Sequence, residues 1–248
     1  MAATLLGRHL TEAHRVAQIQ IQAATIQDLH TIWPLLDPTK DASFEGYSRA
    51  AKVVIGARKA QSAQLASAYF TAYRTAEGAK APAAPALSLD LNGEQAMTSL
   101  YVTGPVQARR ALGAGISYEQ AVQSALVASS GAAARLAAEG GRETLVNSLR
   151  SDDEAHGFAR VTSGRSCAFC AMLAGRGAAY FSEDTASFEA HDHCGCSAEG
   201  VYTPRSQGRH SLPPGSQKYA DLYAEVAKGQ PNPLQAFRAA YEAPDSTP

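Results

Sequence analysis

The sequence predicts a mostly α protein of the α+β class, and two observations lead to this prediction. Hydrophobic residues make up 45% of the 248 residues but aromatic residues only 7%, so that Ala, Leu and Val supply most of the apolar surface. Such a composition favours closely packed helices over an aromatic-rich sheet sandwich. All four cysteines lie between residues 167 and 196. The expected architecture is therefore a long N-terminal helical hairpin, a helical middle region and a small cysteine-containing α+β module.

Residues 1–76 are expected to form the hairpin. From Thr11 to Trp33 the spacings between apolar positions alternate between three and four, as on the buried stripe of an amphipathic helix. The stripe comprises Val16, Ile19, Ala23, Ile26, His30 and Trp33. His30 is thus expected to be partly buried, and Pro34 ends the helix. A second helix is expected to begin near Asp41 and to continue to about Tyr73, so that the two helices pack antiparallel.

Residues 77–98 are expected to be a linker or an extended arm that lies on another surface, because they are rich in Pro, Ala and Gly. Residues 99–150 are the expected helical middle region. Its first residues, Ser99–Thr103, predict a short strand or an extended entry. The sequence Ser117-Tyr118-Glu119-Gln120 has the pattern of a capping box and predicts the start of a helix. That helix is expected to stop at Gly140-Gly141.

Residues 151–203 are expected to hold the cysteine-containing module. Phe158–Thr162 predicts one short strand and Val201–Thr203 its partner, with the cysteines between them. The acidic run Asp152-Asp153-Glu154 is expected to be a solvated loop. Residues 204–248 are expected to be a partly flexible tail with short helices. These helices are expected at Lys218–Ala227 and Pro233–Tyr241.

The net charge of the chain excludes the class of proteins that bind polyanions such as nucleic acids over most of their surface. The 22 basic and 23 acidic residues leave a net charge of −1, whereas such proteins have a clear excess of Lys and Arg. No stretch approaches the roughly 18 apolar residues of a membrane span, and the apolar run Ala2–Leu6 is too short for a signal peptide. We therefore expect no membrane contact and synthesis in a reducing cytoplasm, where clustered cysteines are more often metal ligands than disulfides.

The cysteine segment has the spacing of a metal site. In Cys167-x-x-Cys170, a tight turn can present two thiolates to one ion. The motif His191-x-x-Cys194-x-Cys196 supplies the other half. These five residues compete for the four tetrahedral positions that Zn²⁺ offers. Zn²⁺ is therefore the expected cofactor, in a closed structural site that staples the module and leaves no position for a catalytic water.

Other interpretations of the cysteines fit less well. Incidental buried cysteines do not explain a paired pattern, and a thioredoxin-like redox motif should follow a βαβ pattern that the sequence lacks. Zinc deaminases place an H-x-E before their C-x-x-C, and no H-x-E occurs here. Asp192 and His193 can orient a ligand or lie on the surface. The aromatic residues between the two halves are expected to cover the site. They are Tyr180, Phe181 and Phe188.

The same residues resemble a family signature. The family is the Mu F-like minor head proteins of tailed bacteriophages, also called capsid morphogenesis proteins. In these proteins a mostly helical region is followed by the signature C-x-x-C…G…F…H-P-x-C-R-C. The five ligand candidates fall on its cysteine and histidine positions, while Asp192 stands where the family usually has Pro and Gly195 where it often has Arg. The sequence Tyr101-Val102-Thr103-Gly104-Pro105 most resembles the members of this family that occur in phages of actinobacteria.

The resemblance implies a non-enzymatic structural protein of the virion, inside the phage head near the portal and in several copies. Its implied partners are the portal protein, the major capsid protein and packaged DNA, with assembly in the cytoplasm of the bacterial host. Two alternatives stay open. Some members are labelled capsid maturation proteases, which requires a Ser or Cys nucleophile beside a histidine such as His191 or His193. A zinc-stapled DNA-binding module would use Arg160, Arg165 and Arg176 near the cluster.

Overall fold

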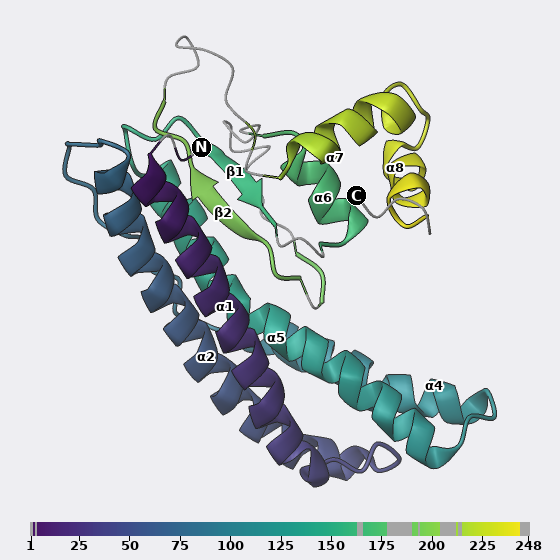
Figure 1. Cartoon of the computed structure of the whole chain (residues 1–248). Coiled ribbons are helices and arrows are strands. Elements are labelled where there is room, and N and C mark those ends of the chain that lie inside the picture. The colour runs from purple at the N-terminus through teal and green to yellow at the C-terminus, as the bar shows by residue number, and fades with distance from the viewer. Residues whose placement is uncertain are drawn as a thin grey trace.

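Three long helices form the body of the protein and run alongside one another (Figure 1). They are α1 (Leu5–Ile32), α2 (Asp41–Ala76) and α5 (Tyr118–Arg150). The first two form the predicted antiparallel hairpin, and a 3-10 turn that contains Pro34 ends α1. This computed structural model describes residues 2, 4–162, 166–177, 190–192, 194–203, 212 and 215–243.

The face that α1 buries is largely polar, and it differs from the predicted stripe. Val16 and Ile19 are 40% and 36% exposed, and the prediction of a partly buried His30 is wrong because His30 is exposed. The buried residues are Gly7, Thr11, His14, Gln18, Ile21, Gln22, Thr25 and Leu29. Buried polar groups cost little when they are hydrogen-bonded. Gln18 meets this condition, since it accepts from Ser62 Oγ at 2.6 Å and donates to the Ser62 carbonyl at 3.0 Å.

His14 is buried against Tyr69 of α2. The two rings stack with centroids 4.5 Å apart and an interplanar angle of 12°. Burial lowers the pKa of His14 to about 4, so the imidazole is neutral at pH 7. The neighbouring Thr11 hydroxyl lies 2.8 Å from Tyr69 Oη and 2.7 Å from Glu199 Oε2. The polar face of α1 therefore binds both α2 and the C-terminal part of the chain.

α5 continues through Gly140 and Gly141, where the sequence predicted its end. At these residues α5 packs closely against α2 and α1. A Cβ on Gly140 would lie 2.2 Å from the carbonyl oxygen of Lys59, and a Cβ on Gly141 would lie 2.7 Å from Ser62 Oγ. The prediction of a helix end is wrong because glycine serves here to let two backbones approach, a use that is compatible with helical dihedral angles.

Residues 79–92 run as an extended arm along α5. Ala86 N–H donates to Ser148 Oγ at 2.9 Å, and Ser88 N–H donates to Thr144 Oγ1 at 2.9 Å. The side chains of α5 thus satisfy backbone groups that have no partner in a sheet or helix.

After the arm, the chain is helical over residues 93–113. The elements are α3 (Gly93–Tyr101), a π-helical turn (Val102–Val106) and α4 (Gln107–Gly113). The strand predicted at residues 99–103 is therefore wrong. Ala96 and Leu100, four residues apart, are fully buried in one cluster with side chains of α2 and α5, so helical spacing decides the local structure. α5 then begins after Ser117, the predicted capping residue.

A two-stranded antiparallel sheet packs on the ends of α2 and α5 (Figure 1). β1 (Phe158–Val161) lies where it was predicted and pairs with β2 (Ser197–Gly200). The second strand was predicted at 201–203 and begins four residues earlier, directly after the last cysteine. In this register Ala198 is buried in one core cluster with Phe158. Val201 lies just beyond β2, and its N–H donates to the carbonyl oxygen of Gly157 at 2.9 Å.

Short helices lie beside the sheet (Figure 1). They are α6 (Ala168–Ala174), α7 (Gln217–Leu222), which continues as a π-helical turn (Tyr223–Ala227), and α8 (Pro233–Tyr241). Met172, Tyr219 and Phe237 form part of a core of their own. α7 and α8 occupy the two positions predicted for helices in the tail. Within the described ranges, no helix has both the length and the apolar character of a membrane span.

Asp152, the first residue of the acidic run, belongs to a buried ion pair, so the predicted solvated loop is wrong at this position, whereas Asp153 is exposed. Asp152 is 4% exposed and accepts from Arg74 at 2.9 and 3.1 Å. Tyr202 Oη donates to the same carboxylate at 2.9 Å. Removing one partner of a buried pair costs roughly 3–5 kcal/mol. This pair therefore fastens the start of the C-terminal part to α2.

Gly140→Ala should destabilise the protein, although Ala is the better helix former. The added methyl group meets the backbone of Lys59, so α2 and α5 must separate at a cost of roughly 1–3 kcal/mol. The matched control is Gly46→Ala within α2, because nothing lies within 4 Å of the Cβ position there. That change should stabilise the protein by about 0.5–1 kcal/mol. Urea unfolding measures the free energy of unfolding of both variants. Equal changes in the two variants would contradict the close packing at Gly140.

Candidate metal centre

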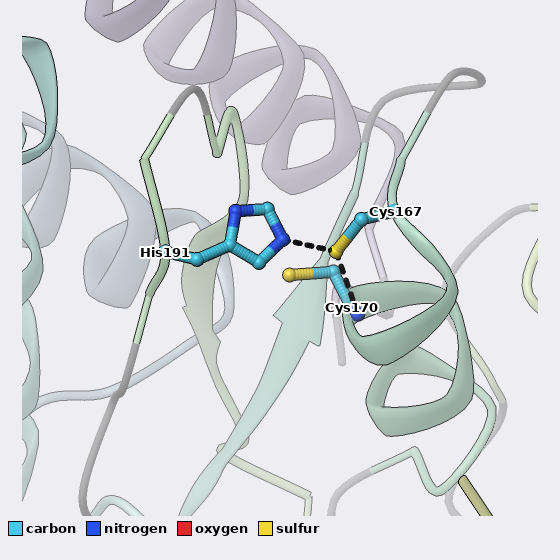
Figure 2. A group of neighbouring side chains, drawn as sticks. All are labelled: Cys167, Cys170 and His191. Atoms are coloured by element: carbon cyan, nitrogen blue, oxygen red, sulfur yellow. Dashed lines mark hydrogen bonds between the residues drawn. The ribbon is translucent and has the colours of Figure 1, made fainter. Parts of the chain in front are cut away.

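The start of α6 holds the first two cysteines. Cys167 is the N-cap residue, and its Sγ accepts a hydrogen bond from Cys170 N–H at 3.3 Å (Figure 2). The first turn of α6 thus places the two thiols beside each other. Tyr241 Oη of α8 donates to the carbonyl of Ser166 at 2.8 Å, so a second helix supports the residue before the cap.

The second half of the cluster is a tight loop that leads into β2. Cys194 N–H donates to the carbonyl oxygen of His191 at 3.2 Å. Cys196 is the last residue before β2. Because β2 pairs with β1, and α6 follows β1 along the chain, the sheet brings the two halves together as predicted.

Three cysteine sulfurs lie together in the interior. Cys170 Sγ lies 3.2 Å from Cys194 Sγ and 3.6 Å from Cys196 Sγ, and the last two are 2.8 Å apart. These three residues are at most 5% exposed. All four cysteines are free, and the distances far exceed the 2.03–2.05 Å of a disulfide bond. The cluster is therefore a group of thiols with ligand spacing.

His191 approaches the cluster from the solvent side. Its Nε2 lies 2.6 Å from Cys167 Sγ, and the ring points toward that sulfur (Figure 2). Its Nδ1 donates to the carbonyl oxygen of Asp192 at 2.7 Å, which leaves Nε2 for the cluster, as in metal-binding histidines. The Asp192 carboxylate accepts from Arg135 Nε of α5 at 2.9 Å. Asp192 therefore orients His191, one of the two roles expected for it.

Two buried arginines contact the cluster, and neither was identified from the sequence as part of the site. Arg160 of β1 donates from Nη1 to Cys196 Sγ at 3.0 Å and lies 3.5 Å from Cys170 Sγ. Arg142 of α5 donates to the carbonyl oxygens of Cys194 and Cys196. The cluster is thus surrounded by positive charge from two different elements.

Strand alternation is the signal that could have identified Arg160. Side chains two apart in a strand share a face, so Arg160 lies on the same face as Phe158, an apolar residue that packs in the core. The interpretation of Arg160 as a DNA contact is wrong, because the buried guanidinium cannot reach a phosphate. Arg176 is exposed, and Arg165 lies outside the described residues.

The surroundings divide the thiols into two kinds. Hydrogen bonds with Cys170, from its thiol and then its backbone N–H, lower the pKa of Cys167 to about 5, and His191 adds to this effect. Hydrogen bonds from neighbouring thiols, followed by the charges of the two arginines, hold the pKa of Cys196 well below its ordinary range. The bonds that Cys170 makes to its neighbours raise its own pKa. Cys167 and Cys196 therefore favour the thiolate, which is the form that binds metals.

The five predicted ligands form two groups that share Cys170. One group adds Cys167 and His191, the other Cys194 and Cys196, and within each group the ligand atoms lie within 4.8 Å of one another. Sulfurs bound at 2.3 Å to one tetrahedral ion are about 3.8 Å apart. Cys170 Sγ lies 3.2 and 3.6 Å from its two neighbours, whereas the 2.8 Å between Cys194 Sγ and Cys196 Sγ would have to widen by about 1 Å if both bound the ion. The donor set can therefore hold a metal ion. Other predicted site residues, His193, Tyr180, Phe181 and Phe188, lie outside the described residues.

A family model described as VG15 protein matches residues 7–226 of the chain. The match spans 220 of the 248 residues (226 − 7 + 1). It includes nearly all of the three long helices and the complete cysteine cluster. No curated protein and no solved structure matches the chain.

In metal-free protein, Cys167 should react with iodoacetamide faster than the other three cysteines. It is the one cysteine that is not buried, and its low pKa keeps it as the reactive thiolate. Mass spectrometry over a pH series should give a midpoint for its alkylation near 5, well below the about 8.5 of an ordinary thiol. His191→Gln, which removes the imidazole beside Cys167, should raise that midpoint. An ordinary midpoint in the unmodified chain would show that the contacts around Cys167 are not formed.

Proposed function

The chain belongs to the VG15 protein family, which indicates a phage-encoded protein, and we propose that it is a minor structural protein of the phage head. In this role it lies inside the head, contacts the portal protein and supports head assembly and the packaging or delivery of DNA. The proposal agrees with the resemblance of the cysteine segment to the Mu F-like minor head proteins. No enzymatic activity is part of it.

The extent of the family match carries the proposal. The match includes both the helical body and the cysteine cluster, and Arg142 of α5 joins the two by hydrogen bonds to the carbonyl oxygens of Cys194 and Cys196. A long rigid body with a cross-linked loop suits a structural component. Among the described residues, no serine side chain hydrogen-bonds a histidine ring, the contact that would activate a serine nucleophile.

We propose Zn²⁺ as the ion of the candidate centre. Thiolates together with imidazole favour zinc over hard cations such as Mg²⁺ or Ca²⁺. Four of the five predicted ligands would hold it. They are Cys167, Cys170, His191, Cys194 and Cys196. When bound, the ion supplies a cross-link between two parts of the chain, Cys170 and Cys194 being 24 residues apart.

Cys170→Ser should remove the zinc-dependent part of the stability, because Cys170 belongs to both ligand groups. With free zinc a thousandfold above its Kd, this part is about 4 kcal/mol. Thermal unfolding of wild type and variant, each with and without a chelator, measures it. The chelator should lower the Tm of the wild type and leave that of the variant unchanged. A wild-type Tm that is the same with zinc bound and with zinc removed would count against the site.

Binding to the portal protein tests the role in the head. The zinc-loaded chain is mixed with the portal protein or the major capsid protein of the same phage, and complexes are separated by sedimentation. Cosedimentation with the portal protein is expected. A folded, zinc-loaded chain that binds neither the portal protein nor assembled heads would contradict the proposal. The same assay with a DNA fragment at rising salt tests packaged DNA as a partner, since phosphate contacts weaken as salt increases.

A capsid maturation protease is the second candidate function, and one contact favours it. Cys167 Sγ and His191 Nε2 lie 2.6 Å apart at the start of α6, as a thiolate nucleophile and its base would. The two functions exclude one another, because any four of the five candidate ligands include at least one of these two atoms. Incubation with unprocessed major capsid protein separates them. Cleavage that persists after chelation and is lost in Cys167→Ser favours the protease, whereas the structural role predicts no cleavage.

A further inference from the structure

Arg160 places a buried cation against two sulfurs of the cluster. Its Nη1 lies 3.0 Å from Cys196 Sγ and 3.5 Å from Cys170 Sγ, and the residue is 1% exposed. The guanidinium carbon lies 5.8 Å from the centre of the Phe169 ring, so an aromatic side chain packs on it. β1 carries Arg160 and pairs with β2, which directly follows Cys196. The sheet therefore sets the distance between the cation and this sulfur.

A second buried cation reaches the same loop from the helical body. Arg142 of α5 is 4% exposed and donates from Nε to the carbonyl oxygen of Cys196 at 3.3 Å. Its Nη2 donates to the carbonyl oxygen of Cys194. Arg142 thus holds the backbone of the loop, whereas Arg160 contacts the sulfurs themselves.

Charge explains why two guanidinium groups are stable in this interior. A buried cation is costly unless an anion lies beside it. Four thiolates around Zn²⁺ carry a net charge of −2 (+2 − 4), and three thiolates with a neutral imidazole carry −1 (+2 − 3). Two arginines balance the charge of the first ligand set and exceed that of the second by one. Hydrogen bonds from a charged donor to a charged acceptor are also about twice as strong as neutral ones.

We propose that Arg160 is a positioning residue of the metal centre, whose buried guanidinium holds the sulfurs of Cys170 and Cys196 in place by hydrogen bonds and thereby assigns both as ligands. The inference rests on the proposed zinc site. It adds to that site two definite ligands, Cys170 and Cys196, and names Arg160 as the residue that selects them. The other two positions fall to two of the three remaining candidates. Without Arg160, the metal-bound sulfurs lose a hydrogen-bond donor and a buried counter-charge, so the centre binds its ion less tightly.

The test is the affinity of Arg160→Met for Zn²⁺, measured by competition with a chromophoric chelator. Methionine keeps an unbranched side chain beside Phe169 but removes the charge and the donors. The Kd should rise about 10–100-fold, the usual effect of losing a partner of a metal ligand. With Co²⁺ as the probe, the sulfur-to-cobalt charge-transfer band should weaken because fewer thiolates bind the ion. Arg160→Lys, which keeps the charge but not the planar fork, should show a smaller loss.

Two control variants separate this role from a merely structural one. Val161→Ala shortens a partly buried side chain of the same strand and leaves Arg160 in place. Arg110→Met makes the matched change at an exposed arginine of α4. Both should keep the wild-type Kd and the wild-type cobalt spectrum, whatever they do to stability.

The outcomes distinguish this inference from the zinc site itself. A wild-type Kd and cobalt spectrum in folded Arg160→Met overturn the role of Arg160 and leave the zinc site in place. Should the methionine variant fail to fold, the same result in Arg160→Lys overturns it equally. A wild-type chain that binds neither Zn²⁺ nor Co²⁺ overturns the zinc site, and the assignment of the two ligands with it.

Discussion

The close grouping of cysteine sulfurs is the constraint on which the C-terminal part of this protein depends. Three of them lie at most 3.6 Å apart in the interior, and they come from two segments that the β1–β2 pairing brings together. Sulfurs so close favour ionisation only when positive charge is near. A metal ion and the two arginines supply that charge in our account. The same arginines connect the cluster to the sheet and to α5, so metal binding and docking of the loop on the helical body are coupled.

The helical body positions Arg142 through its own packing. Two hydrophobic clusters occupy the two ends of the three long helices, and a layer of small and polar residues lies between them. In that layer Gln18 pairs with Ser62, and the buried Lys59 donates to Glu143 at 2.9 Å. Sliding one helix past another would leave these groups unpaired, so the layer fixes their register. The close approach at Gly140 and Gly141 then places the next residue, Arg142, at the cysteine loop.

Features with a local cause could be predicted from the sequence. A proline ends α1, a serine caps α5, the C-x-x-C turn opens α6 and β1 follows from a short apolar run, and each of these depends on a few neighbouring residues. The buried face of α1 could not be predicted in this way, because it is chosen by hydrogen-bond partners on α2 and β2. Two consecutive glycines usually mark the end of a helix, but in α5 they allow the neighbouring helices to approach closely. Arg160 and Asp152 were assigned to the surface from their charge, although partners distant in sequence bury them both.

Zinc coordination in the natively purified chain tests the central claim most directly. X-ray absorption at the zinc edge, combined with elemental analysis, should give one zinc per chain with a sulfur-dominated first coordination sphere at about 2.3 Å. Folded protein that contains no metal, and in which all four thiols titrate freely, would contradict the account.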